Sequence, residues 1–470
     1  MTEKNFAFPD MNDCFRYLHM GLPEDILRRK LAGDFSGAIR LIDRKLALES
    51  TPQSLKNCLL AQREMILRLP GDYPYTRAQA LERIRKHIPD FTEKEFEQRV
   101  DAGKIGWIYG EGGLRFFNRF FETLCKTEPG FAERAGIAMR GAESAGKNST
   151  AVNRLENCIQ VLKERGSCRF RIRVRASLKV KDEVFVPGMY IRAHLPIPCQ
   201  CEDQENITIE EISPAGGQIA REDALQRTIC WEETLQENHP FTVQYSYVRR
   251  SVYRDIEQLQ PSPEQPSFCT QEEPPHILFT PYIRELAAQL TEGIQNPLEK
   301  ARRFYDFITL NMTYTFMPAY FVLENIPENC ARNFTGDCGV FALLFLTLCR
   351  SVGIPARWQS GLATEPDFCG AHDWVQFYVA PYGWLYADPS YGLAAARAGK
   401  EERRQFYFGN LDPYRMAANL GFQASFTVPK RHWRADPYDN QVGEMETSLH
   451  GLLYEEYERE KEVLLCQELE

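Results

Sequence analysis

The stretch GDCGVFALLFLTLCR, residues 336–350, places a cysteine at the start of a long apolar run. Gly336 and Asp337 interrupt the chain just before this run, and aspartate is a preferred N-cap residue of helices. The run is apolar on every side of a helix, which is typical of a buried helix. The sequence therefore predicts a buried helix with Cys338 in its first turn.

This position changes the chemistry expected of Cys338. The thiolate is the nucleophilic form of cysteine, and the positive end of a helix lowers the pKa of a thiol there. Unpaired N–H groups of the same turn can also stabilise an oxyanion. Cys349 lies eleven residues further on, deep in the predicted helix, so we expect it to be a core residue.

A cysteine nucleophile needs a base, and the base needs a residue that orients it. The segment GAHDWVQFYVAPYGWLYADPSYG follows the helix, with His372 expected to open a strand and Asp388 to end the return strand. A simple turn would leave these two residues diagonal, offset by about three positions, since strands pair in register. Asp373 and Asp367 therefore remain alternative partners for His372.

Length and composition indicate a globular protein of several domains. The 470 residues are 43% hydrophobic, and at roughly 100–200 residues per domain they suggest about three domains. The formal net charge of -9 argues mildly against nucleic-acid and anionic-membrane partners.

Residues 1–160 have the periodicity of helices, with a break between two of them at Gly33-Asp34. Two further helices and a hairpin, with Gly110, Gly112 and Gly113 in its turn, resemble a winged-helix-like unit. We favour a helical packing module over a DNA-binding unit, because no basic recognition helix is present.

The pattern changes to a period of two between residues 165 and 258, which predicts an antiparallel β-sandwich. A proline-rich linker, 261–275, separates it from a mixed segment, 275–430, that holds Cys338. Residues 431–470 are predicted to be a C-terminal extension whose charged tail forms a surface helix.

Fourteen cysteines without a CxxC pair suit reduced thiols in a cytosolic protein. We see neither a secretory signal nor an apolar run long enough for a membrane span, so we expect a cytoplasmic protein without membrane contact. Cys199 and Cys201 lack partners at zinc-ligand spacing, and we expect no metal and no cofactor.

Three blocks in order resemble the transglutaminase-like superfamily, which includes papain-like cysteine enzymes: GDCGVFALLFLTLCRSVGIPARW, HDWVQFYV and GWLYADPS. The segment 165–258 is similar to the β-domain that precedes this core in bacterial members, and the resemblance covers about residues 165–445. It implies an α+β multidomain protein with a helical N-terminal region, an antiparallel β-sandwich and a papain-like transglutaminase core.

By this resemblance, Cys338 is the nucleophile, His372 the base and Asp388 the residue that orients it. Tyr314, which closes the NMTY segment, is a candidate second oxyanion donor or else a structural ring.

Trp374, Gln376 and Trp384 are candidates for lining the cleft or for packing. Gln376 departs from the family pattern, which usually has Glu there, so a role in tuning the pair or binding a cationic amine is in doubt.

The resemblance implies acyl transfer from a peptide or side-chain amide through a thioester. Without a calcium-binding motif, the expected reaction is hydrolysis by a protease or amidase, with a protein or peptide as substrate. Amine transfer to protein glutamine is the first alternative, and a protein-binding module with little activity is the second. The sequence does not determine the oligomeric state.

Overall fold

The computed structural model describes residues 11–137 and 150–470. Contacts divide the chain into two compact units. The first unit contains Met1–Lys147, Glu272–Leu278 and Met312–Val340, and the second contains Asn148–Gln271, Phe279–Asn311 and Phe341–Glu470. These units join segments that are distant in sequence, whereas the predicted domains were consecutive blocks, whose boundaries stay predictions.

The predicted break at Gly33-Asp34 separates two helices in the structure. Helices α2 (Glu24–Leu31) and α3 (Phe35–Ala47) are separated at Gly33-Asp34. The Asp34 carboxylate accepts a hydrogen bond from the backbone N–H of Gly37, so it caps α3.

The predicted pair of helices and the hairpin are also present. Capping boxes begin α5 (Arg77–Arg85) and α6 (Glu93–Asp101), because both helices follow a threonine with Gln or Glu at the third position. Strand β1 (Trp107–Gly110) then pairs with β2 (Gly113–Phe116). The winged-helix-like interpretation of this segment stays a prediction.

The remaining part of the first unit joins the N-terminal helices to the segment 312–340. Glu324 forms an ion pair of 2.9 Å with Lys30, and the Arg68 guanidinium lies 3.7 Å from the centre of the Phe321 ring. The other elements of this unit are α1 (Met11–Phe15), the 3-10 helices η1 (Leu18–Met20) and η3 (Tyr320–Val322), α4 (Gln53–Asp72), α7 (Phe120–Thr127), α8 (Pro129–Ala135), β9 (Thr313–Tyr314), α12 (Ile326–Asn333) and β10 (Thr335–Gly336).

The second unit contains the predicted sandwich, made of two four-stranded antiparallel sheets in the orders β17-β3-β8-β5 and β16-β4-β7-β6. Inward-facing residues of both sheets share one core, which follows from the alternation along β3 and β8. The strands are β3 (Ser167–Val180), β4 (Met189–Pro196), β5 (Gln204–Ser213), β6 (Gln218–Ile219), β7 (Thr228–Leu235), β8 (Phe241–Val252), β16 (Glu444–Thr447) and β17 (Tyr457–Leu469).

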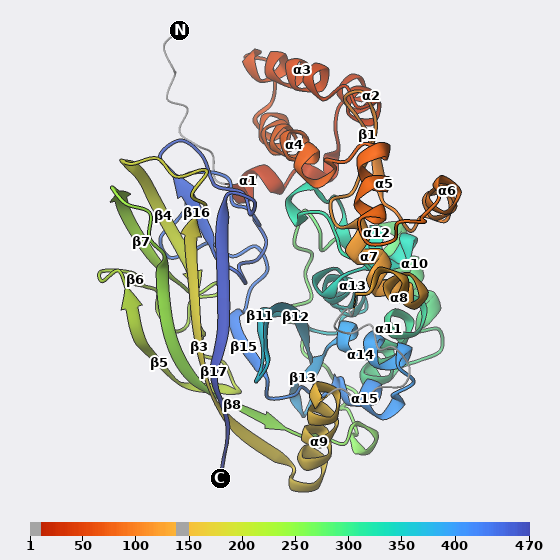
Figure 1. Cartoon of the computed structure of the whole chain (residues 1–470). Helices are drawn as coiled ribbons and strands as arrows, with labels where there is room; N and C mark the ends of the chain where they lie inside the picture. Colours follow the sequence, from red (N-terminus) through yellow and green to blue (C-terminus); the bar gives the residue numbers. More distant parts are fainter. Residues whose placement is uncertain (1–10, 138–149) are drawn as a thin grey trace. The chain divides into compact units, whose positions relative to one another are not determined.

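The prediction of a C-terminal surface helix is wrong. Residues Tyr457–Leu469 form strand β17, which pairs with β3 along nearly its whole length and lies beside it in Figure 1. The glutamates and Lys461 of this tail favour a helix locally, but the open edge of β3 satisfies its backbone groups as a strand. Val463 and Cys466 also pack against the sandwich core.

A five-stranded antiparallel sheet in the order β14-β13-β12-β11-β15 forms the rest of the second unit together with helices. Helix α13 (Cys338–Ser351) begins in the first unit and continues in the second, where Phe345 packs against Phe377 of β12. The other elements are α9 (Thr150–Arg165), η2 (Ile256–Gln258), α10 (Pro281–Leu290), α11 (Pro297–Asn311), β11 (Ala356–Glu365), β12 (Phe368–Val379), β13 (Gly383–Ala387), α14 (Pro389–Arg397), α15 (Glu401–Phe406), β14 (Phe408–Gly409) and β15 (Arg415–Asn419).

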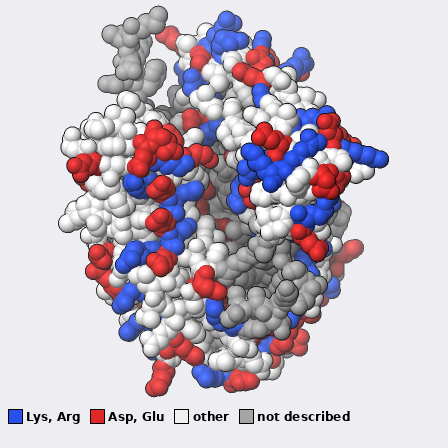
Figure 2. Space-filling model, in the orientation of Figure 1, with Lys and Arg blue, Asp and Glu red and all other residues white. Residues whose placement is uncertain are grey.

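Charged side chains of both signs are interspersed on the face drawn in Figure 2. Within residues 11–137 and 150–470, the helices are all too short or too polar to cross a membrane.

Candidate active site

Cys338 is the first residue of helix α13, as the sequence predicts. The Asp337 carboxylate accepts a hydrogen bond of 3.1 Å from the backbone N–H of Val340, so Asp337 caps the helix. The hydroxyl of Tyr320 also donates to Asp337 and holds the capping carboxylate in place. The positive end of the helix therefore lies at the Cys338 thiol.

Residues 339–350 of α13 are buried, and Cys349 among them is fully buried. Burial raises the pKa of the Cys349 thiol well above its usual value. A protonated thiol is a poor nucleophile, so the prediction that Cys349 is a core residue is confirmed.

His372 and Asp388 contact each other in the second unit. The distance between His372 Nε2 and Asp388 Oδ2 is 2.7 Å, and the two residues are 5% and 0% exposed. His372 does not open its strand, because β12 begins four residues earlier, at Phe368. Since an ionised Asp388 accepts from Nε2–H, the other ring nitrogen, Nδ1, remains as the basic atom.

His372 and Asp388 meet although the sequence predicts a diagonal offset between them, because Asp388 follows the end of strand β13. The register pairs Val375 with Ala387, so Asp388 lies beside the position of Trp374, two residues from His372. Diagonal neighbours on one face of a sheet remain within reach of long side chains. Asp388 also leaves the strand to cap α14, where it accepts from the backbone N–H of Tyr391.

Arg415 is a third buried residue that contacts this pair, and the sequence patterns did not indicate it. Its guanidinium lies 2.9 Å from Asp388 Oδ2 and 2.6 Å from Asp412 Oδ2, with no exposure of Arg415. It also lies 4.3 Å from the centre of the Tyr391 ring. No local motif marks Arg415, because β15 meets Asp388 only through tertiary folding.

The pKa values of the pair follow from burial and from these charges. Burial lowers the pKa of His372, the Asp388 charge raises it and the Arg415 charge lowers it, with the result below the usual value. Burial raises the pKa of Asp388, but the charges of His372 and Arg415 outweigh it and hold this pKa below its usual value. At neutral pH the site therefore presents a neutral imidazole beside an ionised carboxylate.

The two alternative partners of His372 are engaged elsewhere. Asp373 accepts a hydrogen bond from Gln441, and Asp367 forms an ion pair of 2.8 Å with Arg154. Asp388 is thus the carboxylate that the structure places on the imidazole ring.

The three candidate cleft residues differ in exposure. Trp374 and Gln376 are buried. The Trp374 indole N–H donates a hydrogen bond to Gln359, and Gln376 accepts one from Arg357, both on the neighbouring strand β11. Trp384 is half-buried, with the Arg357 guanidinium 4.1 Å from the centre of its ring. The first two pack within the sheet, and a cleft-lining role stays a prediction for all three residues.

Tyr314 belongs to the same compact unit as Cys338. Strands β9 and β10 pair Tyr314 with Gly336, two residues before Cys338. Its role as an oxyanion donor stays a prediction. Because Cys338 belongs to the first unit, whereas His372 and Asp388 belong to the second, the complete triad also stays a prediction.

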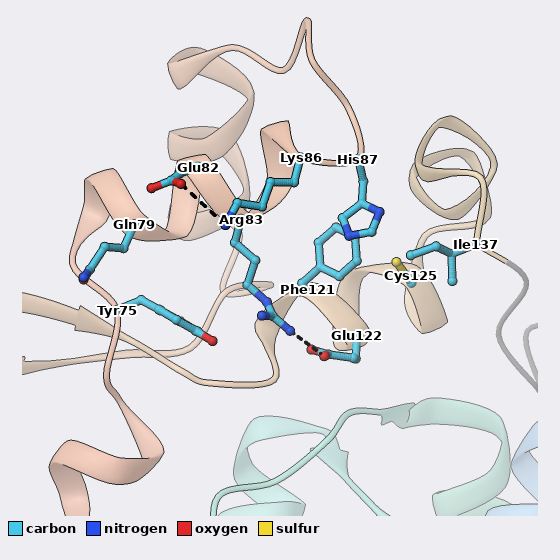
Figure 3. A pocket seen from close by; sticks show the side chains of 10 residues that line it. All are labelled: Tyr75, Gln79, Glu82, Arg83, Lys86, His87, Phe121, Glu122, Cys125 and Ile137. Atoms are coloured by element: carbon cyan, nitrogen blue, oxygen red, sulfur yellow. Dashed lines mark hydrogen bonds and ion pairs between the residues drawn. The ribbon is translucent and has the colours of Figure 1, made fainter.

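A separate cavity of about 430 Å³ lies in the first unit between α5 and α7 (Figure 3). Its charged groups pair with each other, Arg83 with Glu122 at 2.8 Å and Lys86 with Glu82 at 3.5 Å. Burial raises the pKa of its thiol, Cys125, to about 11. The described residues that line this cavity therefore include no activated thiol.

Among the described residues, no group of three or more His, Cys, Asp or Glu side chains is arranged to hold a metal ion.

Comparison with protein families identifies the central part of the chain. Residues 284–389, which include Cys338, His372 and Asp388, match the model of the Transglutaminase-like superfamily. This segment is a transglutaminase-like domain. The match supports a cysteine-based enzyme.

Individual relatives are more distant. The Bacillus subtilis protein YebA is 27% identical over 130 residues, which are 24% of this chain. The chain spans only 18% of that relative.

Two solved structures are also similar. A candidate cysteine protease from Cytophaga hutchinsonii has 17% identity and a TM-score of 0.42, over 65% of this chain and 91% of that chain. The periplasmic domain of TgpA from Pseudomonas aeruginosa has 16% identity and a TM-score of 0.28, over 53% of this chain and 95% of that chain.

Proposed function

We propose that this chain is a hydrolase of peptide or side-chain amides that acts through a Cys338–His372–Asp388 triad. The observation that carries the proposal is the buried hydrogen bond of 2.7 Å between His372 and Asp388. A buried carboxylate on one nitrogen of an imidazole orients the ring and stabilises its protonated form during catalysis. Cys338, at the start of α13, supplies the nucleophile that this base requires.

In the first step, Nδ1 of His372 takes the thiol proton and Cys338 Sγ attacks the amide carbonyl carbon. The developing oxyanion is stabilised by backbone N–H groups at the start of α13. The imidazolium then protonates the leaving nitrogen, the C–N bond breaks, an amine departs and a thioester remains.

In the second step, water attacks the thioester while His372 takes one of its protons. The C–S bond breaks, the acid is released and the proton returns to the Cys338 sulfur. Asp388 stays ionised throughout, which agrees with its lowered pKa and its contact with Arg415.

The buried Gln376 does not decide between water and an amine as the acceptor, because its side chain packs within the sheet. Its side chain is neutral, and its oxygen accepts a hydrogen bond of 2.7 Å from Arg357. Amine transfer remains the second candidate, because the thioester intermediate is common to both reactions.

We further propose that the substrate is a protein or peptide and that the enzyme works in the cytoplasm. Cytoplasmic thiols stay reduced, and the fourteen cysteines of the chain are free thiols.

The test is mass spectrometry of a diverse peptide mixture incubated with a primary amine and either the wild-type protein or Cys338→Ala. New peptide termini, or conversion of glutamine to glutamate, with the wild type alone would support hydrolysis. Amine adducts would assign amine transfer instead.

Cys349→Ala is the matched control, because it removes a thiol from the same helix away from its N-terminus. We expect this variant to keep activity. Equal product formation by wild type and Cys338→Ala would contradict the proposal.

A further inference from the structure

Within the first unit, the segment around Tyr314 lies beside the residues that lead into Cys338. Strand β9 is parallel to β10, and Thr315 N–H donates a hydrogen bond of 2.8 Å to the carbonyl oxygen of Gly336. The chain reaches Cys338 two residues after Gly336. The position of Cys338 is therefore tied to the Tyr314–Phe316 segment.

Helix α7 of the N-terminal region packs on this same segment. Its Thr123 hydroxyl accepts from the backbone N–H of Phe316 at 3.3 Å. The Lys126 ammonium lies 3.6 Å from the centre of the Tyr314 ring, and the Arg119 guanidinium lies 3.6 Å from that of Phe316. Two cations are thus held on the segment that borders the candidate nucleophile.

The pKa of Lys126 responds to burial and to charges in this part of the unit. Burial lowers the pKa of Lys126, the charge of Cys338 raises it, that of Arg119 lowers it and that of Asp337 raises it. Attraction between two opposite charges is mutual, so the ammonium favours a negative charge on Cys338 as well. Asp337 is occupied as the cap of α13 and by the Tyr320 hydroxyl.

Lys126 forms no ion pair with a carboxylate of residues 11–137 or 150–470, although its side chain is half-buried. A cation–π contact offsets part of the cost of burying an ammonium. An anion at Cys338 would offset more of it, because partial burial strengthens electrostatic attraction.

We propose that Lys126 is an electrostatic positioning residue of the active site, held over the Tyr314 ring so that it favours the thiolate form of Cys338. This inference rests on the proposed function. It also assigns a role to the N-terminal helical region, which supplies a cation to a nucleophile more than 200 residues later in the sequence. Among the described residues, Arg119 and Asp337 also act on Lys126, and the proposed triad adds His372 to the charged groups at Cys338.

The test is the rate at which iodoacetamide alkylates Cys338 in the full chain between pH 5 and pH 9, followed by mass spectrometry. Lys126→Met keeps an apolar side chain on Tyr314 and removes the charge. We expect its alkylation midpoint to rise by about one pH unit, so that labelling at pH 6 is roughly tenfold slower. Lys126→Arg should restore the wild-type profile.

Lys94→Met is the matched control, because it removes an exposed positive charge from α6 of the same unit. Its profile should equal that of the wild type. If Lys126→Met does not fold, as judged by circular dichroism, Lys126→Gln provides the neutral variant.

Three outcomes would overturn the inference. They are an unchanged profile in Lys126→Met, an equal shift in Lys126→Arg, and slower turnover in Lys126→Met without a shift, which would assign Lys126 to substrate binding. None of them affects the proposed function, which fails instead if wild-type Cys338 reacts no faster than Cys269, a thiol of similar intermediate exposure.

Discussion

Arg415 and Asp388 form an ion pair in which both side chains are fully buried, with 2.9 Å between Nη1 and Oδ2. Asp412 accepts hydrogen bonds from Nε and Nη2 of the same guanidinium. The candidate catalytic carboxylate is therefore held from two directions, by His372 and by Arg415.

We expect Arg415→Met to lower the free energy of unfolding by about 3–5 kcal/mol, because it leaves two buried carboxylates without their cation. Urea unfolding followed by circular dichroism measures this loss. Arg221→Met is the control, since its ion pair with Asp223 is exposed and screened by solvent, so its loss should change the free energy of unfolding little. Similar losses in the two variants would contradict the role of Arg415.

Asp388→Asn should reduce kcat/KM by about 10²–10⁴-fold while the protein stays folded, by analogy with the aspartate of serine-protease triads. An asparagine oxygen can still accept from Tyr391 and cap α14. Its amide cannot stabilise the imidazolium and would favour the other tautomer of His372. Turnover of a peptide substrate across pH checks this, and wild-type activity would exclude Asp388 from the triad.

Tyr314→Phe separates the two roles considered for this residue. The phenyl ring keeps the face on which the Lys126 ammonium lies, whereas the hydroxyl is lost. If the hydroxyl stabilises the oxyanion, kcat should fall by about 10–10³-fold with little change in stability. An unchanged kcat would assign Tyr314 a purely structural role.

His276 should make the first unit sensitive to acid. Burial lowers its pKa from 6.5 to about 3, and its Nδ1 accepts a hydrogen bond of 3.3 Å from the backbone N–H of Ile326. Below pH 6.5 the unfolded chain binds a proton that the folded chain does not. Stability that is present above this pH is therefore lost on acidification, up to about 4 kcal/mol near pH 3.

His276→Asn keeps an acceptor for Ile326 and cannot be protonated in this range. We expect it to flatten the pH dependence of urea unfolding between pH 4 and pH 6.5. The exposed His19→Asn should leave that dependence as in the wild type. An equally steep loss in His276→Asn would show that other groups cause it.

The sequence was sufficient to predict features that depend only on residues close together in the chain. Asp337 caps α13 through a residue only three positions further on, so the position of Cys338 at the start of the helix was predictable. The break between α2 and α3 and the glycine turn of the β1–β2 hairpin were predictable for the same reason. The alternation in β3 similarly indicated a sheet with one face in a core.

Local propensity gave the wrong prediction for the C-terminal tail, because this segment pairs with a strand that is distant in sequence. Residues 457–469 have helical propensity, but the edge of β3 makes them a strand, and no local signal reports that an edge is open.

The candidate site divides in the same way. The sequence by itself determined which residue types stand ready for acyl transfer, namely Cys338 at a helix start and His372 and Asp388 on strands joined by a turn. Only the tertiary structure decided that Asp388 contacts His372 and that Arg415 forms an ion pair with Asp388. It also placed the Lys126 ammonium over the Tyr314 ring. The physical reason is that capping and alternation depend on neighbours in the chain, whereas buried charges acquire partners only when distant segments pack together.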